Sequence, residues 1–285
     1  MRLPIAFGRI ITRAMSSSTG ATTERFLQGR SALITGSTSG IGLGIAKSLA
    51  ARGCDILLNG FADETVVNRL KNDISSNHGV NVHFFSTDLA KPEELNEMCN
   101  SIKSMYPVVD IIVNNAGFQH VSPIDEFPDE KWHDLLEVLL GAPFRLIKAF
   151  LPGMKTQNYG RVINISSAHG IIASPNKSAY VAAKHGLVGL TKVVALETAE
   201  MNITCNSICP GYVETPIFEF QVKSLAEKES LEYTEAKKKF LSNFHPSKEA
   251  VRVTDVAEMT TFLCTDACRN MTGSQITMDG AWTAK

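Results

Sequence analysis

The segment from Ser167 to Lys184 brings together side chains that could carry acid–base chemistry. Tyr180 lies four residues before Lys184, so on a helix the phenol and the ammonium group share one face. Ser167 lies at the carboxyl end of an apolar run that reads as a strand. A lysine cation beside a phenol, with the positive charge of an oxidised nicotinamide coenzyme nearby, favours the phenolate and lowers its pKa from about 10. These groups suit alcohol oxidation, with Tyr180 as the acid/base, Lys184 as its electrostatic partner and Ser167 holding the substrate oxygen.

A glycine-rich turn over residues 35–42, TGSTSGIG, follows an apolar run and opens a helical pattern. Gly36, Gly40 and Gly42 have the spacing G-x3-G-x-G. Such a turn lets a pyrophosphate approach the backbone at a helix N-terminus, where free N–H groups and the helix dipole favour phosphate. The hydroxyl groups of residues 37–39 add hydrogen-bond donors. The segment therefore predicts a dinucleotide site.

Two further strand ends would contact the adenosine half of this dinucleotide. The second predicted strand ends in Asn59, Gly60 and Phe61, and no Arg or Lys stands there or within residues 36–42 to pair with a 2′-phosphate. NAD is therefore favoured over NADP, although the usual acidic residue is absent as well. Asp88 at the end of the third strand could bind the adenine amino group, or it could cap the following helix instead.

The fourth predicted strand ends in NNAG, residues 114–117. Small residues there would let the coenzyme lie against the sheet. Asn115 could contact the coenzyme, tie neighbouring strands together by hydrogen bonds, or do both.

Strand and helix patterns alternate along the chain from Gly29 onward. The predicted strands cover residues 31–36, 55–60, 80–88, 110–117, 161–167, 203–211 and 274–280, and the main predicted helices cover 41–53, 63–79, 92–106, 128–156 and 176–200. This alternation predicts a doubly wound parallel α/β sheet of the Rossmann type, with helices on both faces, as one domain over residues 26–285. The charged, helix-prone segment 216–252 is expected to form a lid over the ligand crevice; a plain surface excursion is the alternative.

Bulk composition excludes several functions. The formal net charge is −1, so no overall field favours nucleic acid or an anionic membrane. No run of about 18 continuous apolar residues suggests a membrane span. The six cysteines form no C-x-x-C pair, so buried reduced thiols are expected and no metal site.

Residues 1–25 contain four Arg, a single acid and many Ser and Thr, which is typical of a mitochondrial transit peptide; an inconsequential tail is the alternative.

Five motifs together, TGSTSGIG, NNAG, NISS, YVAAK and CPGYVETP, resemble the short-chain dehydrogenase/reductase family over about residues 29–285. The resemblance implies one Rossmann-type domain with a seven-stranded sheet, a homotetramer, no catalytic metal, and contact between Thr215 and the nicotinamide carboxamide. It extends the expected coenzyme site to Gly36, Thr38, Ser39, Gly40, Ile41, Gly42, Phe61, Asp88, Leu89, Asn115, Ala116, Gly117, Tyr180, Lys184, Pro210, Gly211, Val213 and Thr215.

The chain departs from the family pattern at Leu139, where an Asn usually links the lysine to water. Leucine cannot carry a proton, so turnover is expected to suffer unless water or backbone carbonyls complete the relay. Ala281 replaces a usual Gly near the C-terminus, which is a minor change.

Four polar residues are expected around the reaction centre: Gln119, His169, Lys177 and Gln221. Each could be an ordinary surface or loop residue, but as a set they suit a carboxylate. A 3-hydroxy acid would place its hydroxyl at Ser167 and Tyr180 and its carboxylate at this set.

The longer stretches around these residues resemble the bacterial-type subfamily of D-3-hydroxybutyrate dehydrogenases. This resemblance implies a substrate site of Gln119, Ser167, His169, Lys177, Tyr180 and Gln221, with Tyr212 and Trp282 as walls. It implies NAD-dependent interconversion of (R)-3-hydroxybutyrate and acetoacetate, and the leader composition of residues 1–25 fits such chemistry in mitochondria. The alternatives are a 3-oxoacyl reductase or another short hydroxy-acid dehydrogenase, or a low-turnover NAD-binding sensor or scaffold.

Overall fold

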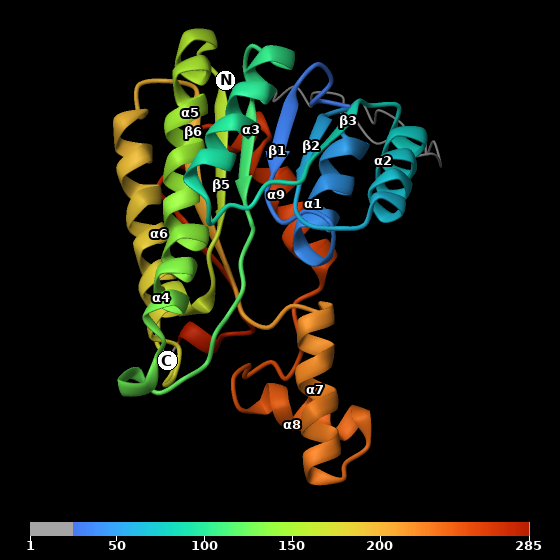
Figure 1. Cartoon of the computed structure of the whole chain (residues 1–285), viewed down its shortest axis with the longest axis vertical. Coiled ribbons are helices and arrows are strands. Elements are labelled where there is room, and N and C mark those ends of the chain that lie inside the picture. The colour runs from blue at the N-terminus through green and yellow to red at the C-terminus, as the bar shows by residue number, and fades with distance from the viewer. Residues whose placement is uncertain (1–24, 285) are drawn as a thin grey trace, which may run out of the picture.

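The computed structural model describes residues 25–284, so the proposed leader lies outside the described residues except for Arg25. Seven parallel strands form one sheet in the order β3-β2-β1-β4-β5-β6-β7 (Figure 1). The strands are β1 (Ser31–Ile34), β2 (Asp55–Asn59), β3 (Val82–Phe85), β4 (Ile111–Asn114), β5 (Gly160–Ile165), β6 (Ile203–Pro210) and β7 (Gln275–Met278). The expected doubly wound parallel sheet is thereby confirmed.

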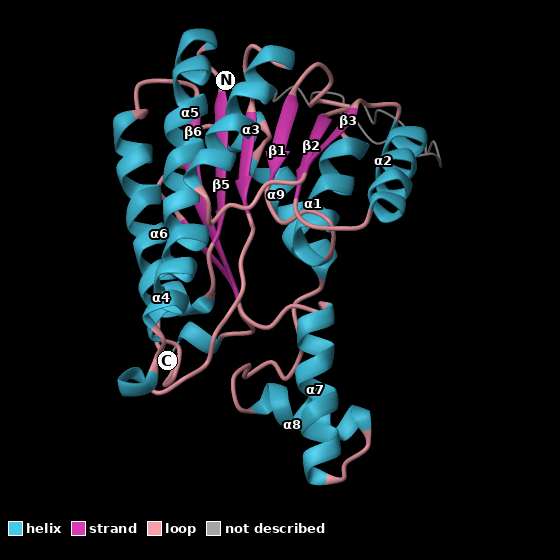
Figure 2. Cartoon of the chain, in the orientation of Figure 1, coloured by secondary structure: helices cyan, strands magenta, loops and turns pink. Residues whose placement is uncertain are grey.

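Helices cover both faces of this sheet (Figure 2). They are α1 (Gly40–Ala51), α2 (Glu64–His78), α3 (Pro92–Met105), α4 (Asp129–Leu136), α5 (Ala142–Gln157), α6 (Ser178–Glu197), α7 (Pro216–Glu229), α8 (Tyr233–Ser242) and α9 (Val253–Leu263). Because side chains alternate across a strand, Ile34 of β1 packs with α1 and α9 on one face, while Leu33 packs with α3 and α5 on the other. The strand order reverses beside β1, and ligands of such sheets bind outside the carboxyl ends of the strands at that point.

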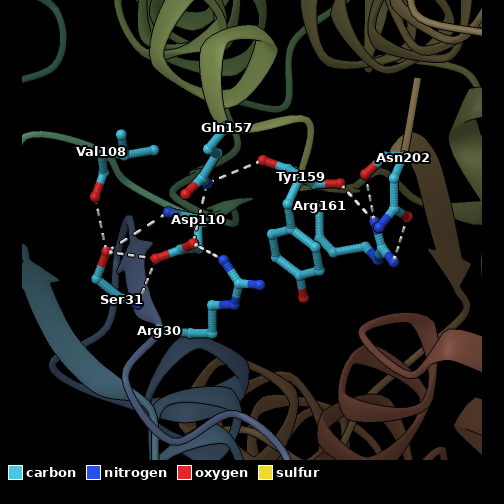
Figure 3. A network of polar contacts seen from close by, with 9 residues as sticks. Arg30, Ser31, Val108, Asp110, Gln157, Tyr159, Arg161 and Asn202 are labelled. Atoms are coloured by element: carbon cyan, nitrogen blue, oxygen red, sulfur yellow. Dashed lines mark hydrogen bonds and ion pairs between the residues drawn. The ribbon is translucent and has the colours of Figure 1, made fainter.

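The amino ends of the strands are tied together by a buried polar network (Figure 3). Asp110, just before β4, accepts hydrogen bonds from Arg30 at 2.7 Å and from the backbone N of Ser31 at 2.9 Å. Arg161, fully buried in β5, donates to the Asn202 carbonyl at 3.0 Å. These contacts hold four neighbouring strands in register, so that their carboxyl ends meet at one edge.

The long helix expected over 128–156 is interrupted by a π-helical turn, Glu137–Gly141, between α4 and α5. Pro143 has no N–H, so the regular ladder of i→i+4 hydrogen bonds cannot pass through this point. The Glu137 carboxylate folds over the turn, where a Cβ on Gly141 would lie 2.5 Å from it. Arg145 holds that carboxylate with two hydrogen bonds of 2.9 and 3.2 Å.

Helices α7 and α8 make up most of the predicted lid, residues 216–252, and project from the body beyond the carboxyl ends of the strands (Figure 1). Their contact surface has its own small core of Phe218, Val222, Ala236 and Leu241. The two ends of the segment meet at a parallel bridge between Val213 and Val251. The segment is therefore a helical pair on a narrow base.

Helix α6 is long and apolar enough to cross a membrane by length and composition alone. It packs along β5 and β6 and buries Lys184 and Thr191, as a core helix does.

All six cysteines are free and buried. Within residues 25–284, no group of three His, Cys, Asp or Glu side chains gathers in a way that could hold a metal ion.

Candidate functional site

The site forms where β5 ends and α6 begins its second turn. Lys184, buried on α6, donates from Nζ to the carbonyl oxygen of Ile165 at 2.7 Å, which anchors the ammonium group at the end of β5. Ser167 and Gln119 lie near enough to the Tyr180 phenol to lower its pKa. The structure therefore brings together the three groups expected to carry the chemistry, together with one of the four expected carboxylate ligands.

Burial dominates the electrostatics of these groups. Desolvation raises the pKa of Tyr180, and the hydrogen bonds from Ser167 and Gln119 only partly oppose it. The Lys184 Nζ lies 5.6 Å from the centre of the Tyr180 ring, and burial lowers the pKa of Lys184 to about 8. In the protein chain alone, desolvation therefore keeps the phenol protonated, and the lowered pKa expected with both the lysine and a positively charged coenzyme beside it stays a prediction.

His169 lies beside Tyr180, and Lys177 lies near enough to His169 for its charge to act on the imidazole. The His169 ring meets the Tyr180 ring edge-on at 6.0 Å, and its Nε2 lies 2.8 Å from the hydroxyl of Ser174. Burial, followed by the positive charge of Lys177, lowers the pKa of His169 to about 4. Burial also lowers the pKa of Lys177, the residue that precedes α6. At neutral pH the pair thus presents a neutral imidazole and one cation.

Gln221 is the expected ligand that the structure does not bring to this group. It lies on α7, which projects from the body (Figure 1). Its position depends on the orientation of the lid, whereas Gln119, His169 and Lys177 belong to the body.

The glycine turn has the geometry that a pyrophosphate requires. Gly36 adopts a φ of +61°, and a Cβ there would lie 2.8 Å from the Cα of Ala116. A Cβ on Gly42 would lie 2.3 Å from the carbonyl oxygen of Gly36. Ser39 precedes α1 without a side-chain cap, and the first turn of α1 has no acidic residue, so its N–H groups are available to an anion.

The hydroxyls of the turn differ in what they can do. Ser37 is fully buried and donates to the Ile34 carbonyl at 2.8 Å, so the expectation that it adds a donor for phosphate is wrong. Ser39 is exposed, and Thr38 and Gly40 are half-buried. The Thr38 hydroxyl donates weakly to the Phe61 carbonyl at 3.4 Å.

The adenosine end of the site is open and carries acidic side chains. Phe61 is 67% exposed, whereas the Asn59 amide is turned inward onto the carbonyls of Phe85 and Thr87, both at 3.2 Å. Asp88 accepts from the backbone N of Ala90 at 2.9 Å. Helix α3 begins at Pro92 after Lys91, so the alternative that Asp88 caps this helix is wrong. Leu89 is buried behind it.

The NNAG segment, residues 114–117, borders the site at the end of β4. The Asn115 amide donates to the carbonyls of Thr35 at 2.9 Å and Gly36 at 3.1 Å, so this residue ties β1 to β4. Gly117 is exposed, and a Cβ there would lie 2.8 Å from a methyl carbon of Leu139. Leu139 is 1% exposed within the π-helical turn, packed against α6. The leucine therefore fills the position of the usual amide with a buried apolar side chain.

The segment after β6 links the coenzyme turn to the lid. Thr215 precedes α7, and its methyl group lies 3.5 Å from where a Cβ on Gly40 would stand. Val213 is buried in the bridge at the lid base. Together with Ile41, Ala116, Pro210 and Gly211, these residues stay predicted coenzyme contacts.

An aromatic cluster at the lid base includes residues that sequence reasoning missed. Tyr212 and Trp282, the expected pocket walls, stack at 5.6 Å between ring centres. Phe244 and His245 pack onto both rings. Neither has a spacing signal, because both follow α8 in a segment whose sequence shows only charge and helix propensity.

Comparison with known proteins places this geometry in context. The family model for short chain dehydrogenase matches residues 30–225. D-beta-hydroxybutyrate dehydrogenase of Cupriavidus necator is 44% identical over 91% of this chain and 100% of its own, and the enzyme of the same name from Rhizobium meliloti is 43% identical over 90% and 99%. The crystal structure of L-sorbose reductase from Gluconobacter frateurii, complexed with NADPH and L-sorbose, superposes with a TM-score of 0.87 at 29% identity, over 92% of this chain and 99% of that chain.

Proposed function

Because this chain belongs to the short-chain dehydrogenase family, and is thus an oxidoreductase with a nicotinamide coenzyme site, we propose that it interconverts (R)-3-hydroxybutyrate and acetoacetate. One observation carries the choice of substrate: Ser167, Gln119 and His169 all lie near the Tyr180 phenol, and the charge of Lys177 acts on His169. A substrate whose hydroxyl lies at Tyr180 would therefore place its other end near a cation and neutral hydrogen-bonding groups. A short 3-hydroxy acid fits this arrangement, because its carboxylate would bind these groups.

The protein groups move one proton during the reaction. Ser167 holds the C3 oxygen, and Tyr180 removes the hydroxyl proton as the C3 carbonyl forms. Bound coenzyme supplies the acceptor for the two electrons of the C3–H bond. Lys184, anchored by the Ile165 carbonyl, keeps a positive charge beside the phenol and opposes the desolvation that raises its pKa. In acetoacetate reduction the same groups return the proton.

The carboxylate of the substrate is assigned to Lys177, Gln119 and His169. Lys177 supplies the charge, since His169 is neutral near pH 7. Gln221 would join them if α7 moved over the body, with Tyr212 and Trp282 as the walls. We propose that the lid closes in this way.

NAD rather than NADP is proposed as the coenzyme. Residues 59–63 at the adenosine end contain no Arg or Lys, and the exposed Asp63 and Glu64 would repel a 2′-phosphate. L-sorbose reductase was crystallised with NADPH, so the fold by itself does not exclude NADP, and the choice of coenzyme is argued from these residues.

A substrate panel with the variant Lys177→Ala tests this function. We expect wild-type protein to oxidise 3-hydroxybutyrate with NAD and to use its methyl ester and NADP poorly. Lys177→Ala should raise the KM for 3-hydroxybutyrate at least about tenfold, since a charge-assisted contact is lost, with the NAD dissociation constant unchanged. Lys131→Ala, an exposed lysine on α4, is the control. Equal rates on acid and ester would eliminate the carboxylate pocket.

Two other functions give different results in the same panel. A 3-oxoacyl reductase would prefer the thioester or ester over the free acid, and relatives with that name are 30% identical to this chain. Leu139 favours a second candidate, a low-turnover NAD sensor, because it replaces a proton-carrying amide by an apolar group. Tight NADH binding without acetoacetate reduction would support the sensor.

Residues 1–25 are proposed as a mitochondrial leader on their composition. A fluorescent protein fused behind these residues should enter mitochondria, and replacement of Arg2, Arg9 and Arg13 by Glu should prevent this. A cytosolic fusion would contradict the proposal.

A further inference from the structure

His245 connects the two ends of the lid through its ring nitrogens. The imidazole is fully buried, with Nε2 2.8 Å from the backbone N of Tyr212 and Nδ1 2.7 Å from the carbonyl oxygen of Glu249. The backbone N–H can only donate and the carbonyl can only accept. His245 is therefore the neutral tautomer with its proton on Nδ1, and both nitrogens are used.

The backbone around His245 is shaped to hold this ring. A Cβ on Gly211 would lie 2.2 Å from the His245 Nε2, so the imidazole fills the space that a side chain at this position would need. Val251 donates to the Tyr212 carbonyl at 2.9 Å, and Glu214 donates to the Val251 carbonyl at 2.9 Å. The chain entering the lid is thus fastened to the chain leaving it, with His245 as the only side chain that hydrogen-bonds to both among the described residues.

Aromatic contacts connect this base to the reaction centre. The His245 ring lies 5.8 Å from the Tyr212 ring and 5.9 Å from the Trp282 ring. Trp282 stacks on Tyr212 at an interplanar angle of 10° and meets His169 edge-on at 5.1 Å. His169 in turn meets Tyr180 at 6.0 Å. A displacement of the Tyr212 backbone would therefore be passed to the groups beside the phenol.

We propose that His245 is a positioning residue for substrate binding: it fixes the Tyr212 backbone and the Tyr212–Trp282 stack, and through them the His169 side of the pocket. It acts through these residues rather than on the reacting atoms. The identity of the substrate rests on the function proposed above, whereas the positioning role rests only on the contacts of the ring.

Two matched variants separate the hydrogen bonds from the packing. His245→Phe keeps a ring but loses both bonds, and His245→Gln keeps one acceptor and one donor. His245→Phe should raise the KM for 3-hydroxybutyrate about tenfold or more, because the buried Tyr212 N–H loses its acceptor, with kcat and the NAD dissociation constant within about threefold. His245→Gln should restore most of the affinity.

Trp282 gives a readout that does not need activity. The chain has two tryptophans, so in a Trp132→Phe background the emission reports on Trp282 alone. His245→Phe should shift this emission, and His245→Gln should return it towards the wild-type spectrum. If the phenylalanine variant does not fold, His245→Asn takes its place, because the shorter amide can reach the Glu249 carbonyl but not the Tyr212 N–H.

Unchanged KM and Trp282 emission in folded His245→Phe would overturn the proposal. So would a parallel loss of NAD binding, kcat and thermal stability without rescue by Gln, which would mark His245 as a general structural residue. If wild-type protein does not act on 3-hydroxybutyrate, the substrate proposal fails by itself. The emission of the Phe and Gln variants then still decides the positioning role.

Discussion

At the residue scale, the site combines a phenol, the proposed acid/base, that burial keeps protonated with a lysine that burial makes less basic. Desolvation raises the pKa of Tyr180 and lowers that of Lys184 to about 8. Both shifts arise because charge is costly inside the protein. In the proposed alcohol oxidation, the positive charges of Lys184 and of the oxidised coenzyme would therefore have to act together on the phenol.

Replacing the phenol hydroxyl tests this arrangement. Tyr180→Phe should reduce kcat about a thousandfold, since general acid–base catalysis is lost. The NAD dissociation constant and the thermal unfolding midpoint should change little, because the ring and its packing against His169 remain. Steady-state kinetics and coenzyme titration check this. A variant that retains a tenth of the wild-type rate would show that another group carries the proton.

His169 makes stability depend on pH. Its pKa is lowered to about 4, below the usual 6.5, so the unfolded chain binds the proton more readily. The stability due to neutral His169 is complete above pH 6.5 and is lost as the pH falls towards 4. By pH 5 this contribution should have fallen by about 2 kcal/mol.

Urea unfolding at pH 7 and pH 5 measures this effect. The loss of unfolding free energy between the two pH values should be smaller in His169→Gln than in wild-type protein by about that amount. His133→Gln, which replaces an exposed histidine on α4, is the control and should behave as wild type. An equal loss in His169→Gln and wild type would show that His169 is not held neutral.

At the element scale, the turn before α1 depends on the absence of side chains. Gly42→Ala would bring a Cβ within 2.3 Å of the Gly36 carbonyl oxygen and 2.6 Å of the Asn115 amide nitrogen. We expect the unfolding free energy to fall by about 1–3 kcal/mol, and NAD affinity to fall with it. Gly189→Ala, in α6 with open space around it, should instead stabilise by about 0.5–1 kcal/mol. Unfolding in urea and coenzyme titration compare the two.

The π-helical turn in the long helix decides how Leu139 is used. The leucine packs between Gly117 and α6, while Lys184 already donates to the Ile165 carbonyl. We expect Leu139→Asn to lower the unfolding free energy by about 3 kcal/mol, because an amide replaces a buried apolar side chain, and to give no gain in kcat. Leu139→Met keeps the volume and should cost less than about 1.5 kcal/mol.

A large gain in kcat for Leu139→Asn would contradict this expectation. It would show that the wild-type relay is broken and would favour the low-turnover sensor.

At the scale of the whole molecule, apolar side chains remain exposed on the outer helices. Val193 and Leu196 on α6 are 50% and 79% exposed, and Phe144 on α5 is 48% exposed. Such groups fit an interface between chains, and the homotetramer stays a prediction. Light scattering after gel filtration should give the mass of four chains, and Leu196→Glu should give a smaller particle. A monomeric wild type would contradict the prediction.

The order of strands and helices follows from the sequence because each buried parallel strand is a short apolar run and each helix has its own periodicity. The Tyr180–Lys184 pair and the glycine turn are likewise local patterns, so spacing alone predicted their shared face and their tight turn. The break at residues 137–141 did not show in the apolar pattern, although Pro143 was a signal for it.

What the sequence determined by itself is therefore local: strands, helices, the phosphate turn and the types of groups available for chemistry. Only the tertiary structure decided how those groups are solvated and joined. Burial, which depends on the whole fold, raised the pKa of Tyr180 in the protein chain alone and made His169 neutral. The contact of His245 with Tyr212 joins residues 33 positions apart through a ring nitrogen and a backbone N–H, and a backbone partner leaves no trace in side-chain patterns.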